Sequence, residues 1–138
     1  MSQADIEALM QQQDWDGVEA AAILSLQQNP CNPRIHAYLG LCLFQKQDWA
    51  AAEAEFQKAT ALQPDFWEAG AKLAQCYERQ HMYSEALIVA KEFHHVQPND
   101  HTLAGLIEYL EPMVHDRVDG WERTAQLGYQ VTLAGDHD

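Results

Sequence analysis

Basic residues are scarce in this chain. Of its 138 residues, 21 are Asp or Glu and only 8 are Lys or Arg, so the formal net charge is −13 at pH 7. Proteins bind nucleic acids through Lys and Arg contacts to phosphates, and anionic membranes attract the same side chains. The composition therefore argues against a nucleic acid or a membrane as the partner, whereas a basic protein would be attracted.

Long apolar runs and paired cysteines are also missing. No stretch of about 18 residues is apolar enough to span a bilayer, and residues 1–13 carry two acids and no base, unlike a secretory leader. The three cysteines are odd in number and lack paired spacing, so they do not indicate a disulfide framework. We therefore expect a cytoplasmic protein.

Motifs of catalysis and metal binding are absent as well. The sequence has no Gly-rich phosphate loop, no serine elbow, and no cysteine with an identifiable histidine partner. Its seven histidines do not follow zinc-site spacing, and the adjacent His94 and His95 would diverge by about 100° on a helix. We expect no enzymatic activity, no metal and no cofactor.

What the chain does have is a repeat of 34 residues. The segment Gln13–Trp15 returns as Gln47–Trp49 and, more loosely, as His81–Tyr83. The same spacing relates three prolines, Pro30, Pro64 and Pro98. Self-similarity at a fixed period of about 20–50 residues is typical of stacked repeat architectures.

Apolar residues within each unit return at helical spacing. Leu39 and Leu43 mark one such stripe, and Ala52, Phe56 and Ala59 mark the next. A single helix of this kind cannot bury its apolar stripe alone. Neighbouring helices must therefore stack on one another, as they do in a solenoid.

Two helix starts can be read directly. Asn32 followed by Pro33 is typical of an N-cap and a first-turn proline. Asp65, with Glu68 three residues later, has the spacing of a capping box and predicts a second start.

In these residues the chain resembles the tetratricopeptide repeat family. The pairs Leu39-Gly40 and Leu73-Ala74 match the large-then-small pair that lets the two helices of a hairpin approach closely. Further matches lie in the second helix of each hairpin and at its terminating proline: Ala52, Phe56, Ala59, Pro64, Ala86 and Pro98. The resemblance implies an all-α fold, a right-handed α-solenoid of antiparallel helix hairpins with about three units and C-terminal capping helices.

The resemblance covers residues 1–111 and implies units at about 1–32, 33–66 and 67–100, with a half unit at 101–111. From Pro112 a new helical stripe runs through Val114, Val118 and Trp121. It predicts a capping helix at 112–130 that hides the last apolar surface; the alternative is that Trp121 enters the groove of this molecule or of a second copy. The polar residues 131–138 are expected to fray.

Members of this family bind peptides or partner helices on a concave face lined by the first helix of each hairpin. The implied groove residues are Tyr38, Leu41, Phe44, Gln45, Lys72, Gln75, Arg79, Leu106 and Tyr109. Leu41 and Phe44 would form an apolar half beside a polar half with Lys72 and Arg79. The alternative is that Phe44 only packs against the first unit.

Some members grip the acidic C-terminus of a heat-shock chaperone through lysines and asparagines. Here those positions hold Glu7, Tyr38, and Leu41 or Glu68, and the only positive charges are on Lys72 and Arg79. The resemblance therefore does not imply this kind of docking.

Three functions follow as hypotheses. The first is a non-enzymatic protein-interaction module whose partner is a peptide or helix, basic or apolar in character. The second is a small acidic chaperone for an exported client of a secretion system. The third is a self-assembling scaffold that forms a homo-oligomer.

Overall fold

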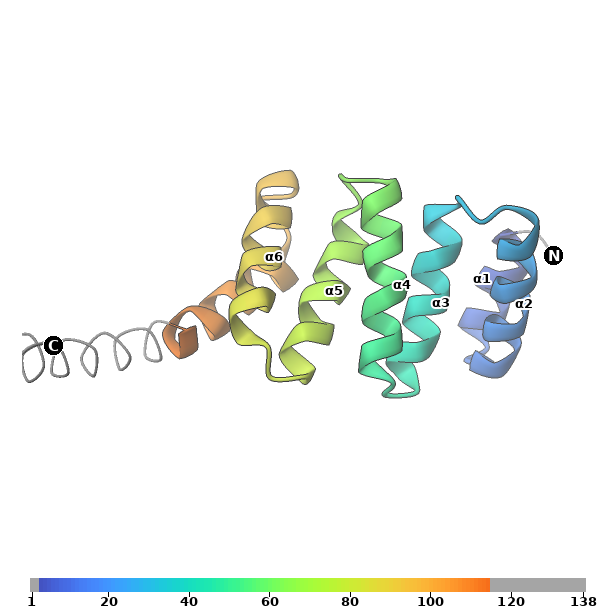
Figure 1. Cartoon of the computed structure of the whole chain (residues 1–138), viewed down its shortest axis with the longest axis horizontal. Helices are drawn as coiled ribbons and strands as arrows, with labels where there is room; N and C mark the ends of the chain where they lie inside the picture. Colours follow the sequence, from blue (N-terminus) through green and yellow to red (C-terminus); the bar gives the residue numbers. More distant parts are fainter. Residues whose placement is uncertain (1–2, 115–138) are drawn as a thin grey trace, which may run out of the picture.

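The computed structural model describes residues 3–114, which form a row of antiparallel helices stacked side by side (Figure 1). No strand occurs in this range, and the predicted all-α solenoid of helix hairpins is confirmed. In chain order the helices are α1 (Gln3–Gln11), α2 (Trp15–Gln28), α3 (Pro33–Gln45), α4 (Trp49–Leu62), α5 (Trp67–Arg79) and α6 (Tyr83–Val96), followed by a helix at 101–114.

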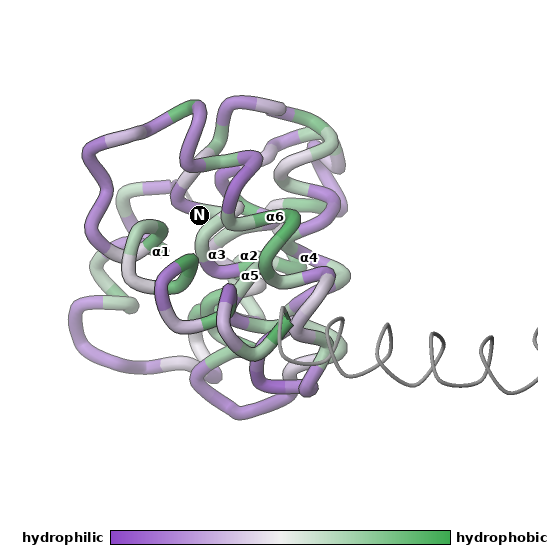
Figure 2. Tube along the Cα trace, turned by 90° about the vertical axis from the view of Figure 1, so that its left-hand side faces the viewer, coloured by the Kyte–Doolittle hydropathy of each residue, from purple (hydrophilic) through white to green (hydrophobic). Residues whose placement is uncertain are grey.

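The helices pack in sequence order, and the apolar residues lie mainly between them. Each helix from α1 to α6 contacts the next, and α3 also contacts α5, so these two first helices of successive hairpins are neighbours on one side of the stack. Seen from one end, hydrophilic residues dominate the outer loops and apolar residues lie mainly towards the interior (Figure 2). None of the described helices is long and apolar enough to cross a membrane.

The 34-residue period is visible in the tight turn inside each hairpin. Gln13, Gln47 and His81 all have positive φ angles, of 58°, 63° and 63°. The next residue in the first two turns is an aspartate, and the side chains of Asp14 and Asp48 cap α2 and α4 by accepting from backbone N–H groups. In the third turn, where the sequence matches only loosely, Met82 stands in place of the aspartate, so α6 has no side-chain cap.

Replacing Gln47 by glycine is expected to stabilise the protein by about 0.5–1 kcal/mol. A left-handed backbone costs a non-glycine residue roughly 1–2 kcal/mol, and glycine avoids that cost at the expense of some unfolded-state entropy. Gln57→Gly in the exposed middle of α4 should instead destabilise by about 1 kcal/mol. Urea unfolding of both variants measures this, and a loss of stability in Gln47→Gly would contradict it.

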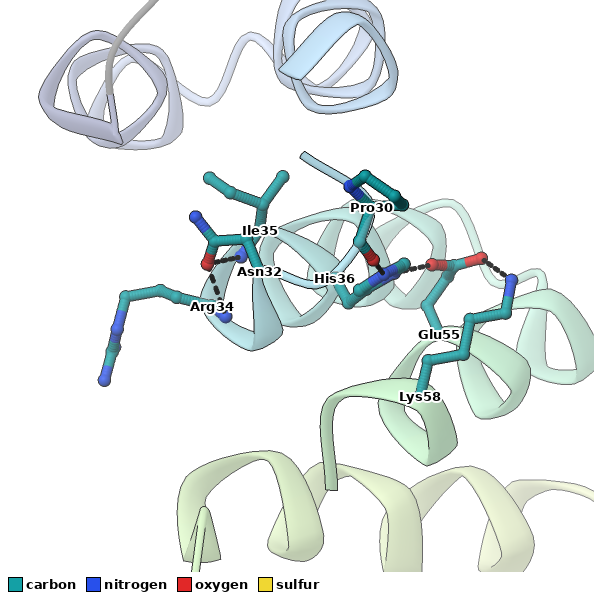
Figure 3. A network of polar contacts seen from close by, with 7 residues as sticks. All are labelled: Pro30, Asn32, Arg34, Ile35, His36, Glu55 and Lys58. Carbon is teal, nitrogen blue, oxygen red and sulfur yellow. Dashed lines mark hydrogen bonds and ion pairs between the residues drawn. The ribbon is translucent and has the colours of Figure 1, made fainter. Parts of the chain in front are cut away.

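One predicted helix start is correct and the other is wrong. The Asn32 side chain accepts from the N–H groups of Arg34 and Ile35 at 3.1 and 3.3 Å, ahead of Pro33 (Figure 3). Asp65, however, does not cap α5: the N-cap is Phe66, without a side-chain hydrogen bond. The Phe66 side chain is buried at 3 % exposure, and its anchoring in the core sets the start of α5 one residue later than predicted.

Two of the three cysteines belong to the core. Cys42 and Cys76 are fully buried, as expected of small apolar side chains at equivalent positions, and burial raises the pKa of both thiols, that of Cys76 to about 12. Cys31 is exposed. No group of three His, Cys, Asp or Glu side chains within residues 3–114 could hold a metal ion.

The last described helix runs through Pro112 to residue 114, so the boundary predicted between residues 111 and 112 falls inside it. Val114 is half-buried against Ala86, Leu87 and Leu110, so the apolar packing between α6 and this helix continues to residue 114. Val118, Trp121 and the remainder of the predicted capping helix, together with 131–138, lie outside the described residues.

Candidate functional site

A hollow of about 180 Å³ opens between α3 and α5. Its lining residues are mostly apolar and come from α3, α4, α5 and the N-cap of α5: Arg34, Ala37, Tyr38, Leu41, Phe56, Phe66, Glu68, Ala69 and Lys72. A second hollow of about 310 Å³ shares Glu68 and Lys72 with the first and extends to Trp67, Ala71, Gln75, Asp100 and Thr102. We call the two hollows together the groove.

Four of the nine predicted groove residues line the groove: Tyr38, Leu41, Lys72 and Gln75. The other five do not line either hollow. Gln45, Arg79 and Tyr109 are exposed elsewhere on the surface, and Leu106 is half-buried against the core clusters of the last two hairpins. Phe44 is half-buried as well, beside the groove.

Phe44 packs towards the second and third units, and the alternative that it packs against the first unit is therefore wrong. Its ring meets Trp49 edge-on with the centroids 4.9 Å apart. The Lys72 ammonium lies 4.7 Å from the centroid of the same ring. Phe44 joins the apolar cluster around Phe56, whose helices are α3, α4 and α5.

The Tyr38 hydroxyl donates a hydrogen bond to the Glu7 carboxylate on α1. This bond lowers the pKa of Glu7. Burial, followed by the same bond, raises the pKa of Tyr38. The Tyr38 hydroxyl is thus engaged by Glu7 rather than free, and the Glu7 carboxylate and the Arg34 guanidinium both lie at this end of the groove, where the charge of Arg34 also lowers the pKa of Glu7.

The cations of the described chain fall into two groups. Lys46, Lys58 and Lys91 pair with carboxylates at distances from 2.6 to 3.2 Å. The other three lie over aromatic rings: Arg34 over Phe66 at 4.9 Å, Lys72 over Phe44 at 4.7 Å and Arg79 over Trp49 at 5.2 Å. Arg34 and Lys72, which both line the groove, form no ion pair within residues 3–114.

Arg34 and Phe66 are groove residues that the sequence reasoning missed. The repeat itself contained the signal for Arg34, because it stands 34 residues before Glu68, which the family pattern turns inward. Phe66 was obscured by the mistaken cap at Asp65. Phe66 is instead the buried N-cap of α5. Its ring lies beneath the Arg34 guanidinium, and both residues line the first hollow.

His36 was also missed, and it holds the first two units together. It is the one buried polar side chain within residues 3–114. Its Nδ1 lies 2.8 Å from Glu55 Oε1 on α4, and its Nε2 lies 2.7 Å from the carbonyl oxygen of Pro30 in the α2–α3 turn (Figure 3). Both nitrogens face acceptors, so both can donate only in the imidazolium form. Lys58 contacts the other Glu55 oxygen at 3.2 Å.

Comparison with known proteins agrees with this fold. The model of the tetratricopeptide repeat matches residues 33–66. No curated protein matches the chain. The first tetratricopeptide domain of Spaghetti (RPAP3), bound to an HSP90 peptide, is similar with a TM-score of 0.78 and 15% identity, over 81% of this chain and 89% of that one.

Two further structures show the same arrangement. The second tetratricopeptide domain of human RPAP3, in complex with an HSP70 peptide, has a TM-score of 0.74 and 11% identity over 78% of this chain and 90% of that one. The Sgt2 domain from Aspergillus fumigatus has a TM-score of 0.76 and 14% identity over 84% of this chain and 78% of that one.

The fold and the matched repeat define a class, that of helical-repeat proteins built from stacked hairpins. Within that class, residues 33–66 match the tetratricopeptide repeat and the described chain has the fold of tetratricopeptide repeat domains, so the resemblance seen in the sequence is confirmed.

Proposed function

We propose that this chain is a non-enzymatic protein-interaction module that binds a peptide or helix of another protein in the groove. The observation that carries the proposal is the hollow between α3 and α5, where an apolar wall of Leu41, Phe56 and Phe66 lies next to Lys72. An apolar anchor beside a few polar groups is the usual composition of a recognition site.

The apolar hollow of the groove measures about 180 Å³, a space that suits one bulky side chain and lies below the roughly 300–1,000 Å³ common for small-molecule pockets. The second hollow, of about 310 Å³, continues the groove along α5 and gives room for the neighbouring residues of a bound segment. Two of the similar structures hold peptides of chaperones, and this supports peptide binding as a use of the fold.

Docking of a chaperone C-terminus remains disfavoured for this chain. The positions that would supply lysines and asparagines to such a peptide hold the hydrogen-bonded pair Glu7 and Tyr38, and Leu41 or Glu68. Of the two cations predicted for the polar half, Lys72 lines the groove and Arg79 lies outside its lining. Carboxylates at these positions would repel the terminal carboxylate of a peptide.

The groove is tested by affinity capture with the purified full chain and two variants, Phe44→Ala and Lys72→Glu. Each should reduce retention of the partner about tenfold or more, because Lys72→Glu reverses the charge of a lining residue and Phe44→Ala removes the ring on which that residue rests. Lys91→Glu is the matched control: it makes the same charge change on α6, away from the groove, and should leave retention unchanged.

Thermal unfolding of every variant separates a lost surface from a lost fold. Equal retention by Phe44→Ala, Lys72→Glu and the parent chain, with all three folded, would contradict the proposal.

The self-assembling scaffold is the second candidate, and an apolar hollow at the α1–α2 end of the stack favours it. This hollow includes Leu9, Ala20 and Leu24, and Leu24 is 52 % exposed. Sedimentation equilibrium of the purified chain decides it: a concentration-dependent mass that Leu24→Lys abolishes would support assembly.

The hypothesis of a chaperone for a secretion-system client predicts a different result in the affinity capture. A single captured protein, encoded by a gene next to the gene of this chain, would support it.

A further inference from the structure

The first hairpin carries apolar side chains on its surface at positions where the next two hairpins are polar. Its helices α1 and α2 form one end of the row (Figure 1). On α2, Ile23 and Leu24 are 43 % and 52 % exposed. The same positions of the repeat are also exposed on α4 and α6, where the residues are Gln57-Lys58 and Lys91-Glu92. The repeat thus supplies its own comparison, and only the first hairpin has an apolar pair at this place among the described residues.

The exposed pair lies beside a hollow of about 330 Å³. Leu24 contributes to its wall, and the other lining residues come from α1, from α2 and from the N-cap of α2: Leu9, Asp14, Gly17, Ala20 and Ala21. We call Leu9, Ala20, Ile23 and Leu24 the α2 patch. No residue that lines this hollow lines the groove, so the α2 patch is a separate surface.

The acids that flank the α2 patch are engaged within the chain. The Asp14 carboxylate accepts a hydrogen bond from the Gly17 N–H at 3.1 Å and so caps α2. Asp16 and Glu19 both bind the Lys46 ammonium, at 2.7 and 2.6 Å. The patch therefore adjoins carboxylates whose charge is compensated, although the chain as a whole carries a net charge of −13.

This distribution of charge favours a second copy of the chain as the occupant of the patch. Two acidic chains repel each other, so they can meet only where their charges are few or compensated. Past Leu24, α2 ends in the exposed amides of Gln27 and Gln28, which donate and accept hydrogen bonds and can pair with the same amides of an identical surface. A basic partner would gain little here, because the nearby acids are already bound.

Resting on the self-assembly hypothesis, we propose that two copies form a closed, two-fold symmetric dimer in which α2 packs antiparallel against α2 of the second copy. A two-fold contact uses the same surface on both copies. With the axis beside Ala20 and Ala21, Leu24 of each copy enters the hollow of the other next to Gly17. Both patches are then covered, and assembly stops at two chains.

The dimer presents two grooves on one particle, because the groove and the α2 patch share no lining residue. A partner with two copies of the recognised segment would then bind with higher avidity than a partner with one, provided that its linker spans both grooves.

Sedimentation equilibrium of the purified full chain tests the dimer. The mass should rise with concentration from one chain to two and no further. The double variant Ile23→Gln with Leu24→Lys gives the first hairpin the residues of the second. It should raise the dissociation constant about tenfold or more, because two apolar side chains leave the contact. Ile88→Lys is the matched control: it places a lysine at a 66 % exposed apolar position on α6 and should leave the constant unchanged.

Added salt distinguishes an apolar contact from an ionic one. Salt should tighten the dimer, since it screens the repulsion between two acidic chains and leaves the apolar contact in place. An association held by ion pairs would weaken instead.

Crosslinking identifies the two-fold axis. Cysteines are introduced singly in a Cys31→Ser chain, in which the two remaining native cysteines are buried. A short bis-maleimide should link Ala20→Cys of one copy to the same residue of the other, since a residue beside a two-fold axis faces its own counterpart. Ala54→Cys, at the equivalent exposed position on α4, should give no link.

The outcomes separate this inference from the functions proposed above. A monomer at every concentration would overturn the inference and the self-assembly hypothesis together, and would leave the groove proposal intact. Association that continues beyond two chains, that survives in a double variant shown by thermal unfolding to be folded, or that salt weakens would overturn the inference alone. A dimer in which Ala20→Cys gives no link would overturn the two-fold arrangement.

Discussion

Replacing Phe93 by alanine is expected to lower the free energy of unfolding by about 3–5 kcal/mol, the range for truncating a buried aromatic side chain. Phe93 on α6 is 4 % exposed and belongs to the cluster that contains Ala71 and Ala74 of α5 and Leu103 of the 101–114 helix. The other buried members of this cluster are three alanines and Leu103, so few buried side chains could fill the space. Urea unfolding followed by circular dichroism measures the loss.

The space for Phe93 depends on a glycine in α5. A Cβ atom added to Gly70 would lie 2.3 Å from the Phe93 ring, a distance at which something must move. Gly70→Ala should therefore destabilise the chain by about 1–3 kcal/mol through overpacking, although alanine is by about 1 kcal/mol the better helix former.

The two residues should be strongly coupled. In the Phe93→Ala background the obstructing ring is gone, and Gly70→Ala should become neutral or stabilising by up to about 1 kcal/mol. Gly105→Ala is the matched control, because a Cβ there meets no atom within 4 Å, and it should stabilise the 101–114 helix slightly. Equal effects of Gly70→Ala in both backgrounds would contradict the packing described here.

Replacing His36 by phenylalanine is expected to destabilise the chain by about 2–3 kcal/mol. The ring volume is kept, but the carbonyl of Pro30 and the carboxylate of Glu55 lose the imidazole nitrogens that face them. Leaving such groups unsatisfied costs about 1–3 kcal/mol each, and the partial exposure of Glu55 to water reduces its share.

Two companion variants make the His36 result interpretable in the same urea experiment. Lys58→Ala removes only the exposed contact to Glu55 and should change stability by less than about 0.5 kcal/mol. Glu55→Leu combined with His36→Phe should recover part of the loss, because the half-buried carboxylate that has lost its histidine partner is then replaced by an apolar side chain. A His36→Phe chain as stable as the parent would show that the bridge contributes nothing.

The parts of the fold that the sequence predicts are those that depend on short-range chemistry. The tight turns at Gln13, Gln47 and His81 and the cap at Asn32 follow from local backbone preferences that repeat every 34 residues. Where a local signal competed with burial it failed, as at Asp65, whose capping pattern was overridden by the anchoring of Phe66 in the core.

The packing between helices could not be predicted in the same way. The 34-residue register aligns His36 with Gly70 and Ala59 with Phe93, so the bulky side chain moves from the first helix of the hairpin to the second between units. Which helix of a hairpin carries the bulky side chain can be determined only when the two helices are placed against each other. The same holds for the groove, where the family pattern points to Lys72 while the ring beneath its ammonium depends on how α3 meets α5.

The most direct test of the groove is site-specific photo-crosslinking in the full chain. A benzophenone amino acid is placed at Gln75, which lines the groove, or at Ile88, which is 66 % exposed on α6 and lies outside the groove lining. With the captured partner present, the account predicts a crosslink from position 75 that Lys72→Glu abolishes, and none from position 88. Crosslinking from position 88 alone would show that the partner binds the opposite helices and would contradict the account.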